Sequence, residues 1–171
     1  MNDIETLAAA GCRFVRLARR EKRPLGAAWQ TRATDNPGDV AAWLRSGSNV
    51  GLLLGPASGV VDVEFDDDDG RATLERMGLV DVATPTWRSA RGEHRLFRWT
   101  DNLPPTAVAR VDGLEVRIGG RAAQSVLPPS LHPGGQAYQW TTHPAGVEIA
   151  AIPQTLMEEL CGQHAEHFGI D

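Results

Sequence analysis

The feature that most constrains the fold is an apolar run with two acidic residues in it, Val60–Phe65. Successive side chains of an extended strand point to opposite faces of a sheet. A strand here would turn its apolar side chains into a core and place Asp62 and Glu64 together on the other face. Neighbouring carboxylates repel, and a divalent cation that binds both relieves the repulsion. The run predicts either a Mg²⁺ or Mn²⁺ site, since both ions prefer oxygen ligands, or an edge strand with two solvated acids.

Residues 114–118 show the same alternation of apolar and charged side chains. As a strand, this segment would turn its apolar side chains inward and leave Glu115 and Arg117 on the other face. Gly119 and Gly120 close this predicted strand.

Turn and capping residues divide the chain into strands and helices. Strands are predicted at residues 12–18, 49–55 and 60–65, on both sides of a glycine turn within 84–99, and at 114–118, 125–130 and 138–140. Helices are predicted from Asn2 or Asp3 to Ala10, from Asn36-Pro37, from the acids at 66–69 to Gly78, and from Pro153 to Gly162. The pattern indicates an α+β fold with a mixed or largely antiparallel sheet and flanking helices, not a doubly wound parallel sheet. The short connection at 56–59 predicts that strands 49–55 and 60–65 form an antiparallel hairpin.

A length of 171 residues favours one domain, which we place at residues 1–162, with a loose C-terminal tail at 163–171. No apolar run is nearly as long as the about 20 residues that a membrane span needs, and the N-terminus lacks the features of a signal peptide. We therefore expect a cytoplasmic protein with no membrane partner. Cys12 and Cys161 indicate neither a disulfide framework nor a zinc site, and the spacing of Cys161, His164 and His167 favours a helix end over a metal cluster.

The net charge of −5 argues against a protein that coats nucleic acid by bulk electrostatics. The charge is unevenly distributed. Residues 13–32 hold six arginines and Lys22 against one acid, whereas residues 62–75 hold seven acids against one arginine. Residues 88–121 are basic again, with seven arginines against four acids. Basic flanks around an acidic centre favour a site that holds metal ions and phosphates together.

Taken together, the segments resemble the bifunctional primase/polymerase (prim-pol) domain of the archaeo-eukaryotic primase superfamily. The matching motifs occur in the same order over nearly the whole chain. They are Lys22-Arg23-Pro24 with Trp29, Trp43, Asn49-Val50-Gly51, Gly55 with Ser58-Gly59, Asp62-Val63-Glu64, Pro85-Thr86, Gly92 with His94 and Phe97, Glu115-Val116-Arg117, and Pro128-Pro129-Ser130 followed by Gly135, Tyr138 and Trp140. The resemblance implies that residues 1–162 form a prim-pol catalytic domain.

The resemblance also implies the roles of individual residues. In that family a D-x-[DE] pair and a third acid on a later strand bind the catalytic metals, and a histidine on an intervening strand contacts the phosphates of the incoming nucleotide. The implied catalytic and metal-binding residues here are Asp62, Glu64 and Glu115, and the phosphate-binding residue is His94. Asp112 is the alternative third ligand, and Glu115 is preferred because it lies within the alternating strand.

Further nucleotide-binding candidates surround His94 in the sequence. Arg88 and Arg91 would neutralise the β- and γ-phosphates, and Ser89 could donate from its hydroxyl. Lys22, Arg117 and Ser130 complete the predicted nucleotide-binding set. Structural alternatives remain for several residues. His94 could be a hydrogen-bonded strand histidine, Arg117 could be the ion-pair partner of Glu115, and Trp29, Trp43, Tyr138 and Trp140 favour core packing over base stacking.

The function implied is a metal-dependent, template-directed nucleotidyltransferase, a DNA primase or DNA polymerase with a two-metal Mg²⁺ or Mn²⁺ site. Its substrates would be NTPs or dNTPs and single-stranded or primed DNA, in a replication protein of a plasmid, phage or mobile element. The chain has no helicase P-loop, so a helicase would be a further domain or subunit. The alternatives are a catalytically silent nucleotide- or single-strand-binding module and a metal-dependent phosphohydrolase or nuclease.

Overall fold

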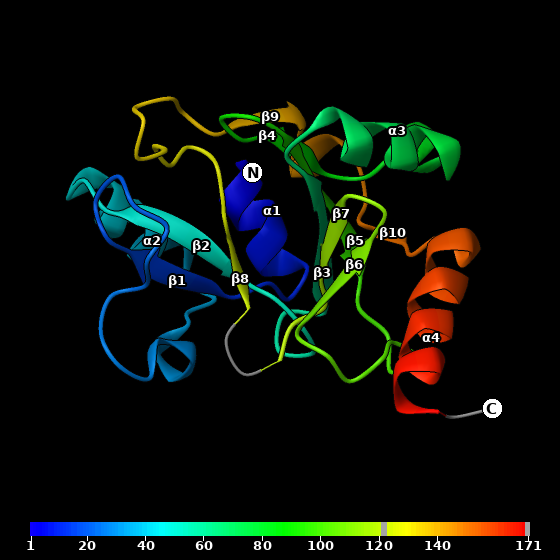
Figure 1. The fold of residues 1–171 in the computed structure, drawn as a ribbon. Helices are drawn as coiled ribbons and strands as arrows, with labels where there is room; N and C mark the ends of the chain where they lie inside the picture. Colours follow the sequence, from blue (N-terminus) through cyan, green and yellow to red (C-terminus); the bar gives the residue numbers. More distant parts are fainter. Residues whose placement is uncertain (121–122, 170–171) are drawn as a thin grey trace.

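The computed structural model describes residues 1–120 and 123–169, and this part of the chain forms four α-helices and ten strands (Figure 1). The helices are α1 (Asp3–Ala9), α2 (Pro37–Arg45), α3 (Asp68–Arg76) and α4 (Gln154–Phe168). The strands are β1 (Phe14–Leu17), β2 (Asn49–Leu53), β3 (Val60–Phe65), β4 (Thr86–Arg88), β5 (Glu93–Arg98), β6 (Val108–Val111), β7 (Leu114–Arg117), β8 (Gln124–Val126), β9 (Gln139–Thr142) and β10 (Ala150–Ala151). No helix in these ranges is both long enough and apolar enough to be a membrane span.

Three of the predicted helix starts are confirmed by side-chain caps. Asn2 and Glu5 form a reciprocal capping box at α1, with hydrogen bonds of 2.8 and 2.9 Å. Asn36 caps α2 ahead of its N-terminal proline, and Asp67 caps α3 by accepting from the backbone N–H of Gly70 at 2.9 Å. Local sequence therefore determines where these helices begin.

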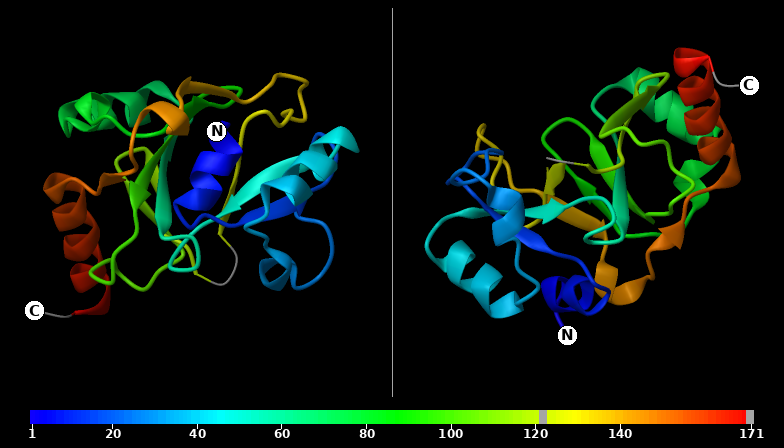
Figure 2. Two further views of the ribbon diagram at one scale, coloured as in Figure 1. Left: turned by 180° about the vertical axis from the view of Figure 1, so that it is seen from behind. Right: turned by 90° about the horizontal axis from the view of Figure 1, so that it is seen from below.

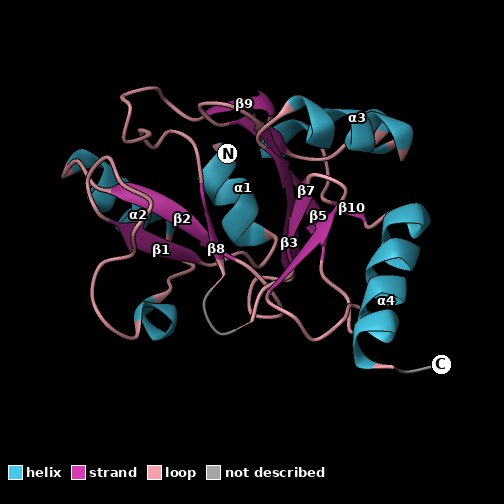
Figure 3. Cartoon of the chain, viewed as in Figure 1, coloured by secondary structure: helices cyan, strands magenta, loops and turns pink. Residues whose placement is uncertain are grey.

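The strands form two sheets among the described residues, joined by loops (Figure 3). The smaller sheet has the order β1-β2-β8 and is antiparallel. The larger sheet has the order β6-β7-β3-β5-β4-β9 and is antiparallel, while β10 pairs with β5 in parallel. The predicted α+β class with a mixed, largely antiparallel sheet is confirmed.

The predicted hairpin of residues 49–55 and 60–65 is wrong. Strand β2 belongs to the smaller sheet and β3 to the larger one, and the two segments meet only in a single antiparallel bridge between Gly55 and Val60. A strand has two hydrogen-bonding edges, and both edges of each strand are already paired. Strand β2 lies between β1 and β8, and β3 lies between β5 and β7.

The larger sheet separates two hydrophobic cores. On its outer face Val61 and Val63 share a core with Leu156 of α4. On its inner face Trp87 and Leu96 share a second core with the smaller sheet, α1 and α2. Figure 1 and the right-hand view of Figure 2 show α4 on one side of the larger sheet and the smaller sheet on the other. The inner face around Trp87 and Leu96 therefore lies against protein rather than solvent.

Strand β3 lies at the centre of this arrangement. Its alternate residues Val61, Val63 and Phe65 pack into the outer core, as predicted. Asp62 and Glu64 point to the inner face, where their residues are only 0% and 8% exposed. The alternative of an edge strand with solvated acids is therefore wrong, and both carboxyl groups need partners inside the protein.

Helix α4 is longer than predicted. The expected end at Gly162 is wrong, because the helix continues to Phe168 and is closed by Gly169 with a φ of 62°. Glycine in an exposed helix interior costs only about 1 kcal/mol relative to alanine, which is too little to end a helix by itself. Of the predicted tail, residues 163–168 are thus helical and residues 170–171 lie outside the described residues; the domain boundary at residue 162 stays a prediction.

Candidate active site

Two neighbouring strands of the larger sheet bring three ionisable side chains together on the inner face. Glu64 on β3 lies opposite His94 on β5 in the strand register. Asp62 lies two residues before Glu64 on β3, and both point to the same face. His94 Nδ1 lies 2.7 Å from Asp62 Oδ2 and 2.8 Å from Glu64 Oε2. All three residues are buried. His94 is thus a hydrogen-bonded strand histidine whose partners are the two predicted metal ligands, and its phosphate contact stays a prediction.

Strand β8 of the smaller sheet closes the cluster from the opposite side. Ser125 donates its hydroxyl to Asp62 Oδ2 at 2.5 Å. Arg117 on β7 pairs with Glu64 Oε1 at 3.2 Å and also donates to the backbone carbonyl of Gln124 at 3.2 Å. Sequence analysis missed Ser125, because a single serine in a three-residue strand gives no periodic or motif signal.

Trp87 on β4 supports the histidine. Its ring stacks on that of His94, with centroids 4.8 Å apart and planes inclined by 4°. The indole Nε1–H of Trp87 donates to the carbonyl of Val126 at 3.0 Å, and Trp140 packs edge-on at 5.3 Å. The predicted core role of Trp140 and Tyr138 is confirmed, since both belong to or pack against the inner core.

Electrostatics inside the cluster favour a charged histidine. Burial alone would lower the pKa of His94, but the carboxyl groups of Asp62 and Glu64 outweigh it and raise that pKa to about 10. Burial would likewise raise the pKa of Glu64, but His94 and Arg117 lower it to about 2. At neutral pH a protonated imidazole is therefore hydrogen-bonded to an ionised Glu64.

The stability of the chain should depend on pH in two windows. The stabilising charge of His94 is fully present below its ordinary pKa of 6.5 and is lost as the pH rises through about 10. The charge of Glu64 stabilises above its ordinary pKa of 4.5 and is lost as the pH falls through about 2. Urea unfolding in EDTA should show that His94→Gln removes much of the alkaline loss seen in the wild type. Parallel alkaline losses in the two proteins would contradict this role of His94.

The residues of the cluster fit a divalent cation. Asp62, Glu64 and His94 each offer one ligand atom, and these atoms lie within 4.8 Å of one another. Asp62 Oδ1 is buried and has no hydrogen-bond partner among the described residues, which is unusual for a carboxylate oxygen. Carboxylate oxygens suit Mg²⁺ and Mn²⁺, whereas the imidazole could coordinate a metal only after losing the proton that it carries at neutral pH.

The two candidates for a third acidic ligand occupy different places. Glu115 on β7 lies directly opposite Glu64, and its carboxylate pairs with Arg110 at 2.7 Å and with Arg117 at 2.9 Å. Asp112 lies in the turn between β6 and β7 with a φ of 44°, where its exposed carboxylate pairs with Arg76 at 3.1 Å. Neither belongs to the group of close ligand atoms found within the described ranges. The register thus places Glu115 beside the cluster, and the predicted ion pair of Arg117 with Glu115 is confirmed.

Of the predicted phosphate-binding residues, Arg88 ends β4, and Ser89 and Arg91 lie in the turn between β4 and β5. The Ser89 hydroxyl accepts from the backbone N–H of Gly92 at 3.0 Å and so stabilises the turn. Gly92 packs against the end of β3 so closely that an added Cβ would lie 1.6 Å from the carbonyl oxygen of Phe65. Arg88 and Arg91 are exposed. Glycine at position 92 therefore lets the basic turn approach the end of the strand that carries the acids.

Two other predicted nucleotide-binding residues lie on the smaller sheet or near it. Lys22 and Arg91 lie near His132. Burial lowers the pKa of His132 most, and the charges of these two cations lower it further. The backbone carbonyl of Lys22 accepts from the Gln124 side chain at 2.9 Å. The Ser130 hydroxyl is buried and bonds to the backbone N–H and carbonyl of Val50 at 2.9 and 3.2 Å, which attaches its loop to β2.

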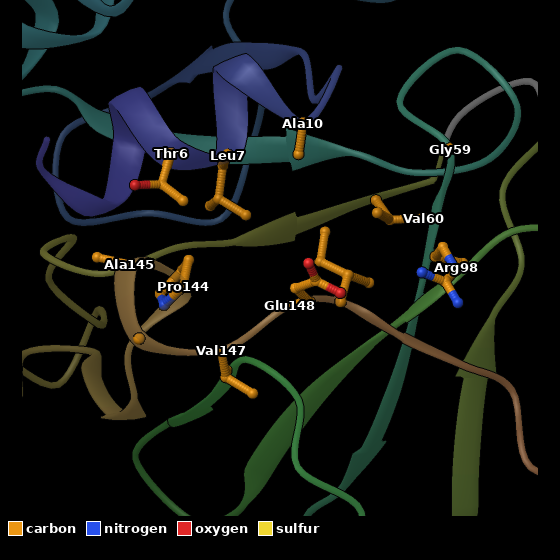
Figure 4. Close-up of a pocket in the computed structure, with 12 residues that line it drawn as sticks. Thr6, Leu7, Ala10, Gly59, Val60, Arg98, Pro144, Ala145, Val147 and Glu148 are labelled. Atoms are coloured by element: carbon orange, nitrogen blue, oxygen red, sulfur yellow. The ribbon is translucent and has the colours of Figure 1, made fainter.

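The cavity beside the cluster is smaller than a second cavity elsewhere in the protein. The smaller one has a volume of about 230 Å³ and is lined by Glu64, Asp66, Arg110 and Glu115 among others. A larger cavity of about 660 Å³ lies between α1, the start of β3 and residues 144–149 (Figure 4). Its described lining includes none of the predicted site residues.

Comparison with known proteins agrees with this geometry. No curated protein matches the chain. Residues 4–155, however, match the family described as bifunctional DNA primase/polymerase, N-terminal. The match covers all of the strands in the described ranges and includes the whole Asp62–Glu64–His94 cluster. The chain therefore belongs to the family of bifunctional DNA primase/polymerase N-terminal domains.

Proposed function

We propose that the chain is a metal-dependent, template-directed nucleotidyltransferase with DNA polymerase or primase activity. The observation that carries the proposal is the buried cluster of Asp62, Glu64 and His94 on the central strands of a Prim-Pol domain. Membership in this family implies a nucleotidyltransferase-type enzyme that binds nucleotide and DNA. The finer assignment, including the residues that act, is the proposal.

In this proposal Asp62, Glu64 and Glu115 are the metal ligands and catalytic residues. Bound Mg²⁺ or Mn²⁺ ions would activate a primer 3′-hydroxyl and neutralise the leaving pyrophosphate. The unpartnered Asp62 Oδ1 supports the role of Asp62. The position of Glu115 opposite Glu64 supports Glu115 over Asp112, whose carboxylate is exposed and paired with Arg76.

The basic residues around the cluster would bind the triphosphate. His94 is protonated at neutral pH because its pKa is raised to about 10, and a cationic imidazole suits a phosphate contact. Arg88 and Arg91 are exposed at the turn next to β5 and can reach a ligand from solvent. Ser89, Lys22, Arg117 and Ser130 remain predicted nucleotide-binding residues.

We extend the proposal to substrates and setting on the family relationship alone. The substrates would be NTPs or dNTPs with single-stranded or primed DNA, and the setting a cytoplasmic replication protein of a plasmid, phage or mobile element. A helicase domain or subunit would separate the strands.

One observation favours a second candidate, a catalytically silent nucleotide-binding module. Glu115 is engaged by Arg110 and Arg117, outside the group of close ligand atoms. Glutamate at both Glu64 and Glu115 also makes two ligands a methylene longer than aspartate, and Mg²⁺ demands near-octahedral geometry.

The test is extension of a labelled primer on a DNA template with dNTPs and Mg²⁺ or Mn²⁺. We expect products that lengthen with metal and are absent in EDTA. Omission of one dNTP should stop synthesis at the complementary template base, because the reaction is template-directed. Release of nucleotides from the primer without extension would instead indicate a phosphohydrolase or nuclease. Nucleotide binding without any product would indicate the silent module.

A further inference from the structure

The two carboxylate oxygens of Asp62 have unequal surroundings. Oδ2 accepts two hydrogen bonds, from Ser125 Oγ at 2.5 Å and from His94 Nδ1 at 2.7 Å. Oδ1 is buried and has no hydrogen-bond partner in the described part of the chain. One oxygen is thus saturated by protein donors, and the other is left for a ligand that the protein does not supply.

The bond from Ser125 crosses between the two sheets. Asp62 lies on β3 of the larger sheet, and Ser125 lies on β8 of the smaller one, 63 residues further along the chain. Pairing of Ser125 with Leu52 of β2 fixes the position of Ser125 in the smaller sheet, and the serine is only 3% exposed. The donor is therefore held rigidly by a different sheet from the one that carries its acceptor.

The two hydrogen-bond donors to Asp62 differ in whether they bond to Asp62 only. His94 Nδ1 is shared between Asp62 Oδ2 and Glu64 Oε2. Under the proposed function His94 contacts phosphate, so its bonds to the carboxyl groups are exchangeable. The Ser125 hydroxyl, in contrast, has a single proton and donates it to Asp62 Oδ2. A carboxylate turns easily about its Cβ–Cγ bond, so a permanent donor is needed to keep one oxygen aimed at a ligand.

We propose that Ser125 is a positioning residue for metal binding. Its hydroxyl fixes the orientation of the Asp62 carboxylate so that Oδ1 faces the cation. Ligating carboxylates are commonly held by hydrogen bonds of this kind, and loss of such a partner typically weakens metal affinity by about 10- to 100-fold. The inference rests on the proposed function in taking Asp62 as a metal ligand and His94 as a phosphate contact.

The test is a titration of the full chain with Mn²⁺ alone. Binding is measured by calorimetry and by the electron paramagnetic resonance signal of free Mn²⁺. We expect Ser125→Ala to bind Mn²⁺ about tenfold more weakly than the wild type. Ser125→Thr keeps the hydroxyl and should restore most of the affinity. Ser58→Ala is the matched control, because the buried Ser58 hydroxyl accepts a hydrogen bond from the Arg13 backbone at 2.9 Å and the control does not alter the cluster.

A second measurement separates positioning from general damage. In primer extension, Ser125→Ala should raise the Mn²⁺ concentration needed for half-maximal rate by about tenfold, with KM for dNTP at saturating Mn²⁺ unchanged. Circular dichroism in EDTA checks that the variants are folded. If Ser125→Ala does not fold, Ser125→Cys keeps most of the volume with a weak donor and should show the same loss of affinity.

The outcomes distinguish this inference from the proposed function. If the wild type and the folded Ser125 variant bind Mn²⁺ equally tightly, or if the variant binds more tightly, the positioning role is overturned and the proposed function stands. If Ser125→Ala and Ser58→Ala weaken binding equally, the effect is a general loss of packing and the role is also overturned. If the wild type itself binds no Mn²⁺, the metal dependence in the proposed function fails, and the positioning role is overturned with it.

Discussion

Asp62→Asn is expected to reduce primer extension by about a thousandfold at saturating substrate, because under the proposed function it loses a metal-binding charge and with it several kcal/mol of transition-state stabilisation. Asparagine has nearly the shape of aspartate, so the inner face stays filled. The change nevertheless removes the negative charge that His94 contacts at 2.7 Å and replaces one carboxylate oxygen with an amide donor. Single-turnover extension of a labelled primer measures the effect directly.

The matched control for this prediction is Asp101→Asn. It makes the same chemical change at an exposed loop residue outside the cluster, and its activity should stay within about threefold of the wild type. Loss of a buried charge partner also destabilises proteins, so both variants are assayed well below their unfolding temperatures. Wild-type activity in Asp62→Asn would remove Asp62 from the catalytic machinery.

Trp87→Ala is expected to lower the free energy of unfolding by about 4 kcal/mol, the middle of the range for large aromatic residues in cores. Trp87 is fully buried and lies between the rings of His94 and Trp140. It also joins the two sheets, because its Nε1–H donates to the Val126 carbonyl of β8 at 3.0 Å. Truncation leaves a cavity and a buried carbonyl without its donor, and urea unfolding in EDTA measures the sum.

Two variants separate these contributions. Trp87→Phe keeps much of the ring but loses the hydrogen bond, and should cost about 1 to 3 kcal/mol. Trp99→Ala makes the same truncation at a partly buried tryptophan of the outer core and should cost less than Trp87→Ala. An equal loss in Trp87→Ala and Trp99→Ala would show that Trp87 is ordinary packing and not a link between the sheets.

The local features of the fold could be predicted because short-range physics controls them. The caps at Asn2, Asn36 and Asp67 need only residues within one turn of the helix. The separation of Val61, Val63 and Phe65 from the two acids follows from the period of a strand. The errors arose where a local signal was too weak to decide, as at Gly162, where the helix continues, or where sheet pairing overrode it, as between β2 and β3.

The site itself was only partly predictable. The pairing of His94 with Asp62 and Glu64 depends on the register of β3 against β5, which no segment specifies alone. Ser125 was missed because its partner lies 63 residues away in another sheet. A hydroxyl gains its role from where the chain places it, so residue type and spacing carry no sign of that role.

By itself, the sequence determined that Asp62 and Glu64 lie side by side behind a hydrophobic strand face, and that the chain has the ordered motifs of its family. Only the tertiary structure decided that this strand is central, that β2 and β3 part into two sheets, and that His94 and Ser125 converge on Asp62. The physical reason is the range of the interactions. Side-chain alternation and capping act within a few residues, whereas sheet pairing and burial of charge are settled by contacts between distant segments.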